Sequence, residues 1–248
     1  MMVDQLSFTV ALERAVLNNQ GSGGIGTFSE KLLHRTLKYY FEADEKNHEI
    51  EFLGSVADIK NENGIIEIQT GSFSKLVPKL ERFLECAKVT VVYPIIENKT
   101  ICRINTETGE SKPPRKSAKK GRVSNALAEI SMIRRFIPND NLEILVVMVD
   151  VSETRMLYRK KKIGRKHTDK LNCIPTRINS IIKLNSVDDY RQLVPEGLSN
   201  QFTSQEFEKA SGLRGIGAHG SLSLLMQLGI LKRERHGRDP YIYSLNNS

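Results

Sequence analysis

The sequence predicts an α/β protein in which a helix, three strands, a second helix and a fourth strand follow one another. Two patterns predict this order: apolar side chains recur at helical spacing in two segments, and β-branched residues dominate the segments between and after them. The segments, in chain order, are 27–43, 48–53, 55–70, 73–87 and 88–96. From about residue 172 the pattern changes to short helices and a hairpin, so we expect two domains, 1–171 and 172–248.

Length and composition are those of an ordinary globular protein. The chain has 248 residues, of which 39% are hydrophobic and 27% are charged. The longest strongly apolar run, Ile144–Val149, is too short to span a bilayer, and the N-terminus lacks the basic-then-apolar order of a signal peptide. We therefore expect a cytoplasmic protein that does not associate with a membrane.

The charge and the cysteines narrow the range of partners and cofactors. A net charge of +8 and a pI near 9.3 favour a polyanionic partner, nucleic acid first. The three cysteines, Cys86, Cys102 and Cys173, are far apart and lack the spacing of a zinc site. We interpret them as reduced thiols.

A predicted hairpin carries an acidic side chain on each of its two strands. Asn61-Glu62-Asn63-Gly64 is typical of a turn, and β-branched residues flank it. Closing the turn there pairs Lys60 with Ile65 and places Asp58 opposite Glu67, so that both project to one face of the sheet. Two carboxylates in otherwise apolar strands cost stability unless a group such as a divalent cation compensates their charge.

A capping box predicts the start of the first helix, residues 27–43. Thr27-Phe28-Ser29-Glu30 has the spacing of that motif, with Glu30 at its N3 position. The Glu30 carboxylate is open to two interpretations: it caps the helix, or it belongs to a functional site together with Asp58. His34 follows one turn later on the same side, where we expect a packing role or a phosphate contact.

Two runs of basic residues interrupt the apolar pattern. Lys112–Arg122 has six Lys or Arg residues among eleven, with two prolines and a glycine, and predicts a mobile loop. Arg159–Lys166 is the second run. Each can be a solvated surface, but two such runs in one basic chain favour contacts with a phosphate backbone. The candidate contacts are Arg115, Lys116, Lys119, Lys120, Lys160, Lys161 and Lys162.

The last fifty or so residues show two short helices followed by a basic hairpin. A capping box at Thr203–Glu206 opens one helix, Gly212 ends it, and a second helix covers Ser221–Leu228. With the phrase Leu225–Arg233 leading into a strand, this region resembles the winged helix-turn-helix superfamily. Winged helices bind DNA or other proteins, so both roles stay open. The candidate DNA contacts are Arg233, Arg235 and Arg238.

Glu30, Asp58 and the pair Glu67-x-Gln69 occur in an α-β-β-β-α-β order of predicted elements. In this respect the chain resembles the PD-(D/E)xK nuclease superfamily. The resemblance implies a restriction-endonuclease-like αβββαβ core, here with a C-terminal winged-helix domain. It also implies that Asp58, Glu67 and the backbone carbonyl of Ile68 bind Mg²⁺ or Mn²⁺, which stabilises charge during phosphodiester hydrolysis.

The sequence departs from the superfamily pattern at two positions. Ala57 stands where proline is common, a change that the superfamily tolerates widely. Gln69 stands where lysine is usual, and glutamine can hydrogen-bond a water but carries no positive charge. Lys75 or Lys79, on the following helix, could supply the missing ammonium. Both can equally be solvated charges, and both are candidate DNA contacts.

These features predict a metal-dependent DNA endonuclease of restriction or defence type, with Glu30, Asp58, Glu67 and Gln69 as catalytic residues. Two alternatives remain. One is a nuclease-fold protein that binds DNA or regulates but has lost catalysis, and the other is a protein-interaction module. Double-strand cleavage by a nuclease with a single site usually implies a dimer, so a homodimer is a candidate state.

Overall fold

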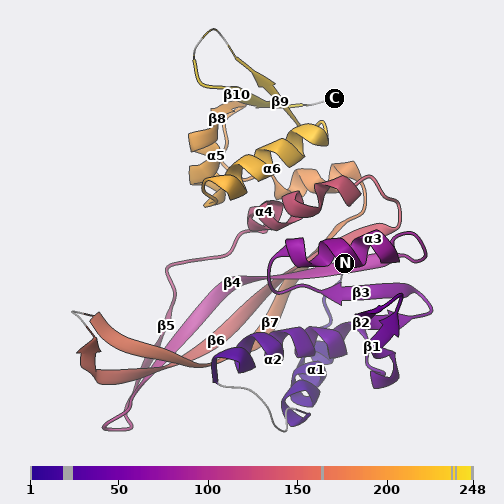
Figure 1. Cartoon of the computed structure of the whole chain (residues 1–248). Coiled ribbons are helices and arrows are strands. Elements are labelled where there is room, and N and C mark those ends of the chain that lie inside the picture. Colours follow the sequence, from indigo (N-terminus) through magenta and orange to yellow (C-terminus); the bar gives the residue numbers. More distant parts are fainter. Residues whose placement is uncertain (1, 19–24, 163–164, 236, 238, 247–248) are drawn as a thin grey trace.

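The fold is a mixed α/β arrangement with one large sheet and a smaller C-terminal sheet (Figure 1). The computed structural model describes residues 2–18, 25–162, 165–235, 237 and 239–246, and the side chains of 25–31 and 159–168 lie outside this description. Among the described helices, none has both the length and the apolar character needed to cross a bilayer.

The large sheet has the strand order β1-β2-β3-β4-β6-β7, and β5 pairs with the outer part of β4. The pairs β3–β4 and β4–β6 are parallel, whereas the remaining pairs are antiparallel. The strands are β1 (His48–Phe52), β2 (Ser55–Asn61), β3 (Gly64–Ile68), β4 (Val89–Asn105), β5 (Ser111–Lys116), β6 (Leu142–Lys162) and β7 (Arg165–Leu184).

Helices cover both faces of this sheet. On one face lie α1 (Gln5–Leu17) and α2 (Ile25–Phe41), and on the other lie α3 (Val77–Phe83) and α4 (Ala126–Ile130). The predicted order of helix, three strands, helix and strand is confirmed by α2, β1, β2, β3, α3 and β4. The 3₁₀ segments are η1 (Glu45–Asn47), η2 (Phe73–Leu76), η3 (Val123–Asn125), η4 (Ser131–Phe136) and η5 (Val187–Leu193).

Alternation along β6 produces two separate apolar cores. Ile144, Val146 and Met148 pack toward α3 and α4, while Val147 and Val149 pack toward α1 and α2. A strand that is buried on both faces reads as a continuous apolar run, which explains the Ile144–Val149 segment. The two cores fix α2 and α3 on opposite sides of the sheet.

The C-terminal unit packs on the α4 side of the large sheet (Figure 1). A capping box at Thr203 and a left-handed Gly212, with φ of 73°, delimit its first helix as predicted. Phe207 and Leu225 of this unit share one apolar cluster with Leu127 of α4. Its elements are β8 (Gln201–Thr203), α5 (Ser204–Ser211), α6 (Ile216–Gln227), β9 (Leu231–Glu234) and β10 (Ile242–Leu245), and its strand order is β8-β10-β9.

Several predicted boundaries differ from the structure. α2 begins at Ile25, so Thr27 lies inside its first turn rather than at the N-cap. The second predicted helix divides into η2 and α3, because Pro78 favours the first turn of a helix, and α3 ends at Phe83. Residue 172, where we expected the second domain to begin, lies within β7, and the chain leaves the large sheet after Leu184.

The strands β4, β6 and β7 are much longer than predicted. The predicted strands 88–96 and 101–104 are one continuous β4, and β6 runs on to Lys162. The outer residues of these strands are polar, yet they still pair. The backbone of each neighbouring strand supplies their hydrogen-bond partners. We call residues 99–105, β5, 151–162 and 165–175 the arm, which extends beyond the helices in Figure 1.

The predicted mobile loop Lys112–Arg122 is wrong in its first half. Ser111–Lys116 forms β5, a fully exposed strand at an edge of the arm, where Pro113 and Pro114 need donate no hydrogen bond. The second half is anchored, because the N–H of Gly121 donates to the Ile96 carbonyl at 3.1 Å.

Gly121 leads to a stability prediction. A Cβ at this position would lie 2.3 Å from the Ile96 carbonyl oxygen, so we expect Gly121→Ala to lower the free energy of unfolding by about 1–3 kcal/mol. Urea denaturation measures this change. Gly71→Ala is the matched control, since its Cβ would meet only Gln69 Nε2 at 3.8 Å. Equal stabilities of the two variants would contradict the close approach.

Candidate active site on β2 and β3

The carboxylate of Asp58, on β2, lies between α2 and β3. Its Oδ2 is 3.2 Å from Nε2 of His34 and accepts a 2.8 Å hydrogen bond from the backbone N–H of Ile68. The other oxygen, Oδ1, accepts no hydrogen bond from the described residues. Asp58 is therefore oriented through one oxygen while the second stays available to a ligand.

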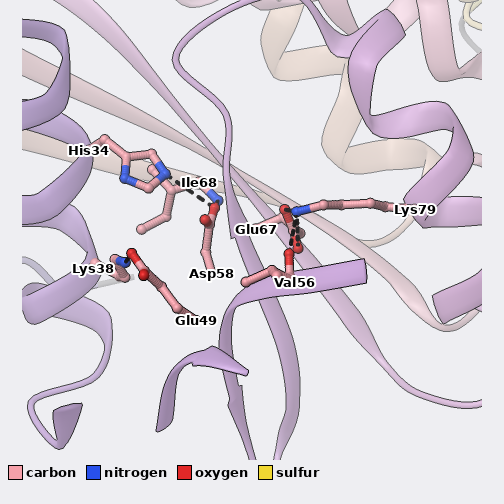
Figure 2. Close-up of polar contacts among 8 residues, drawn as sticks. All are labelled: His34, Lys38, Glu49, Val56, Asp58, Glu67, Ile68 and Lys79. Atoms are coloured by element: carbon pink, nitrogen blue, oxygen red, sulfur yellow. Dashed lines mark hydrogen bonds and ion pairs between the residues drawn. The ribbon is translucent and has the colours of Figure 1, made fainter. Parts of the chain in front are cut away.

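Glu67, on β3, faces α3 instead. The ammonium of Lys79 lies 2.7 Å from its Oε2 and 3.0 Å from its Oε1, and it also donates to the Val56 carbonyl at 2.6 Å. Glu67 is only 2% exposed, so its charge is compensated by contact rather than by water. In Figure 2 the carboxyl groups of Asp58 and Glu67 lie between His34 on one side and Lys79 on the other.

The hairpin has the predicted register but not the predicted common face. Lys60 pairs with Ile65, and the β2–β3 ladder ends at Ile59 and Ile66, before Asp58 and Glu67. Ala57 packs in the α3 core and Ile59 in the α2 core, although residues two apart in a regular strand share a face. β2 therefore changes face at Asp58, which turns this carboxylate toward α2.

The reason for this change lies in β1. His48 pairs with Ile59 and Ile50 with Ala57, which places Glu49 opposite Asp58. Glu49 has a φ of 52°, in the left-handed region that side chains other than glycine rarely adopt. Its carboxylate accepts a 2.7 Å hydrogen bond from Lys38, whose side chain is buried on α2.

The two carboxylates have opposite pKa shifts. Burial raises the pKa of Asp58, but the hydrogen bond and charge of His34 and the N–H of Ile68 outweigh burial, so the pKa lies below its ordinary value. For Glu67, burial and the charge of Asp58 raise the pKa to about 7, although Lys79 acts in the opposite direction. Asp58 is thus ionised at neutral pH while Glu67 is poised to gain or lose a proton.

The structure separates the other predicted site residues from these two. The Nε2 of Gln69 donates to the Ser72 carbonyl at 2.9 Å and so stabilises the turn before η2. Lys75 is exposed on η2. Glu30 belongs to α2, but its side chain lies outside the described residues. Of the two lysines that we considered as substitutes for the missing charge, Lys79 contacts Glu67.

The carbonyl of Ile68 lies on the Asp58 side of β3. Alternate residues of a strand direct their backbone groups to opposite neighbours. Ile65 and Gln69 donate to β4 at 2.9 Å each, at Lys88 and Val92. The N–H and C=O of Ile68 therefore point away from β4, and its N–H reaches Asp58.

The predicted DNA contacts are dispersed over the molecule. Arg115 and Lys116 lie on β5, and Lys119 and Lys120 are exposed just after it. Arg233 and Arg235 place their guanidinium groups 4.1 and 5.0 Å from the ring centroid of Tyr241 in the β9–β10 hairpin. The backbone of Lys160, Lys161 and Lys162 belongs to β6, but their side chains, like the whole of Arg238, lie outside the described residues.

Sequence reasoning missed two members of this cluster. Lys38 and Glu49 carry no motif, and only the left-handed backbone at Glu49 brings them beside Asp58. For His34 the helical spacing from Glu30 was the signal, although its contact with Asp58 was not predicted. Within the described part of the chain, no cluster of three or more His, Cys, Asp or Glu side chains has the geometry to hold a metal.

Comparisons with known proteins identify a family but no activity. A family model described as a domain of unknown function (DUF8091) matches residues 31–185, which include Asp58, Glu67 and Lys79. An uncharacterized protein of Treponema pallidum (strain Nichols) is 33% identical over 147 residues, or 56% of this chain. The chain spans 58% of the length of that relative. No solved structure matches the chain significantly.

The raised pKa of Glu67 leads to a prediction about stability. Because this pKa rises from 4.5 to about 7 on folding, the folded protein binds more protons than the unfolded chain between these values. Stability should therefore fall as the pH increases through this window. We expect the metal-free wild type to lose about 2 kcal/mol between pH 5 and pH 8 relative to Glu67→Gln.

Urea denaturation of both proteins at the two pH values measures this difference. Folding lowers the pKa values of Asp58 and Glu153, so these carboxyl groups change the free energy of unfolding below this pH window. They leave the comparison unaffected. A wild type whose stability follows that of Glu67→Gln from pH 5 to pH 8 would show that Glu67 is ionised throughout.

Proposed function

We propose a nuclease function for this chain, which belongs to the DUF8091 family, described as a domain of unknown function. Specifically, we propose a metal-dependent DNA endonuclease with a PD-(D/E)xK-type site and a restriction-endonuclease-like core. One observation carries the proposal: Asp58 and the buried Glu67 lie on neighbouring strands just beyond the end of the β2–β3 ladder, and the Lys79 ammonium contacts both oxygens of Glu67.

The donor set fits a hard divalent cation. Asp58 keeps one carboxylate oxygen available, the Ile68 carbonyl lies on the same side of β3, and burial together with the charge of Asp58 raises the pKa of Glu67. This electrostatic strain between two carboxylates is what a cation would relieve. Mg²⁺ is held by as few as one or two carboxylates plus waters, so a third acidic ligand is not required.

Each residue then has a distinct part in phosphodiester hydrolysis. Bound Mg²⁺ supplies stabilisation of negative charge on the phosphate and a more acidic water. Asp58 and Glu67 would hold the cation, and His34 orients Asp58 through Oδ2. Lys79 supplies the positive charge that Gln69 lacks, from a helix rather than from β3. The charge thus reaches the site from a different backbone position.

The C-terminal unit supports DNA binding through its hairpin rather than through its second helix. The order β8, α5, α6, β9 and β10 is that of a winged helix, which we propose for this unit. α6 contains no Lys or Arg, and Gly220 brings it so close to η4 that a Cβ would lie 2.6 Å from Ser131 Oγ. Arg233 and Arg235 are exposed on β9 and just after it, on the ring of Tyr241, where we propose that they contact phosphates.

Site variants test the nuclease function directly. We expect Asp58→Asn and Lys79→Ala each to lower plasmid cleavage with Mg²⁺ or Mn²⁺ by about a hundredfold or more, since each removes a charge from the reacting centre. Gel assays of supercoiled plasmid measure this loss. Lys75→Ala, an exposed lysine nearby on η2, should cleave like the wild type.

Unfolding midpoints and a rescue variant separate chemistry from folding. Lys79→Arg should recover part of the activity, because it restores the charge. If the wild-type protein binds DNA but never cleaves it, the chain is instead a DNA-binding protein without catalytic activity. Equal cleavage by Lys75→Ala and Lys79→Ala would refute the role of Lys79.

Cation affinity should depend on pH. A cation competes with the proton on Glu67, whose pKa is about 7, so Mg²⁺ should bind about tenfold more weakly at pH 6 than at pH 8. Isothermal titration calorimetry with Mg²⁺ alone measures both affinities. The dependence should disappear in Glu67→Gln, and an equal dependence in that variant would assign it to another group.

A further inference from the structure

Four cations form a single row across the arm. Lys112 on β5 pairs with Arg103 on β4, which pairs with Arg155 on β6, which pairs with Lys170 on β7. Directly paired residues of a regular ladder project to the same face of a sheet with Cβ atoms about 5 Å apart. The Lys112–Arg103 and Arg155–Lys170 pairs each lie next to a shift of register. The row is therefore one line of positive charge that no sequence run reveals, since its members come from four separate strands.

The row is unfavourable for folding by itself. Like charges directly opposite each other destabilise a sheet, and neutral residues would serve the pairing equally well. Only Arg155 has a carboxylate partner, Glu153, which lies 2.5 Å from its Nε. Arg103, Lys112 and Lys170 form no ion pair with the described residues. Binding of a polyanion would reduce the repulsion among these four cations.

Over residues 99–104 of β4 and 151–156 of β6, charge is confined to one face of the sheet. Lys99, Arg103, Glu153 and Arg155 share the face on which α2 packs. The residues that alternate with them on β4 and β6 carry no charge: they are Thr100, Cys102, Ile104, Ser152, Thr154 and Met156. The opposite face of these segments thus offers hydroxyl groups but no positive charge to a phosphate, and the charge favours binding on the α2 side.

The charged face is the same face toward which Asp58 turns. Asp58 contacts His34 of α2, so the site and the row open on one side of the sheet. Val92 pairs with Ile68 beside Asp58, and Arg103 lies eleven residues further along β4. At about 3.3 Å per residue this separation is about 35 Å, close to one turn of B-DNA.

The width of the row also fits duplex DNA. Three strand intervals of about 4.8 Å make it about 14 Å wide, slightly more than the ~12 Å major groove of B-DNA. The outer cations, Lys112 and Lys170, would then reach phosphates on both edges of one groove. The major groove of A-form RNA is narrow and deep, so a flat row of this width does not match it.

We propose that the row Lys112–Arg103–Arg155–Lys170 binds the phosphate backbone of duplex DNA about one helical turn from the phosphate at Asp58. The row would be the surface that holds the DNA substrate of the proposed nuclease. Only the position of the cut relative to the row rests on that proposed function. Binding by the row itself requires no catalysis and no metal.

Salt dependence of binding in EDTA tests the row without cleavage. Fluorescence anisotropy with a labelled 30-base-pair duplex, over a series of KCl concentrations, measures the slope of log affinity against log salt. Arg103→Gln/Lys170→Gln should lower the magnitude of this slope by about 1.8, because each lost phosphate contact contributes about 0.9. Affinity at low salt should fall about tenfold or more.

Lys46→Gln/Lys88→Gln removes the same charge elsewhere and is the matched control. Lys46 is exposed on η1, and Lys88 is exposed at the end of β4 away from the arm. This control should keep the wild-type slope. Equal slopes in the wild type and the Arg103/Lys170 variant, or no binding of duplex by the wild type, would overturn the proposal.

Two further outcomes distinguish the row from the nuclease. If the row variant loses affinity while the wild type never cleaves with Mg²⁺, the row stands and the nuclease function fails. If the wild type cleaves and the row variant binds normally, only the row fails. Binding of an A-form RNA duplex with the same affinity and the same dependence on Arg103 and Lys170 would overturn the assignment to DNA.

Discussion

The contact between the Lys79 ammonium and the buried carboxyl of Glu67 is the interaction on which the site depends. Glu67 is almost completely removed from water and lies near the charge of Asp58, so its ionised form needs an adjacent cation. Lys79 supplies that charge and also joins α3 to the end of β2 through Val56. The same contact therefore joins α3 to the sheet and sets the charge at the proposed site.

The sheet explains how one molecule can combine that centre with a binding surface. Its inner part is apolar on both faces and holds α2 and α3 against opposite sides. Its outer part, the arm, continues the same strands. Val151 and Cys173 are buried against α1 and α2, whereas Lys112 and Lys170 are exposed. Because β4 and β6 run through both parts, the distance between Asp58 and the row of cations is set by rigid strands.

Local backbone strain is concentrated at this site. Glu49 adopts a left-handed conformation opposite Asp58, and β2 changes face at the same point. Such conformations cost energy and persist where the surrounding structure enforces them. Here Asp58 contacts His34 and Glu49 contacts the buried Lys38, which assembles four charged or titratable groups beside the middle of β2.

The sequence by itself determined the order of the elements, the Lys60–Ile65 register and the two strand acids, because periodicity, turn residues and capping motifs act over a few neighbouring residues. Only the tertiary structure decided that Lys79 rather than Lys75 contacts Glu67, that Asp58 and Glu67 face different helices, and that Lys112–Arg122 begins with a strand. It also aligned the four cations of the arm. These outcomes depend on pairing and packing between distant segments, which no local pattern records.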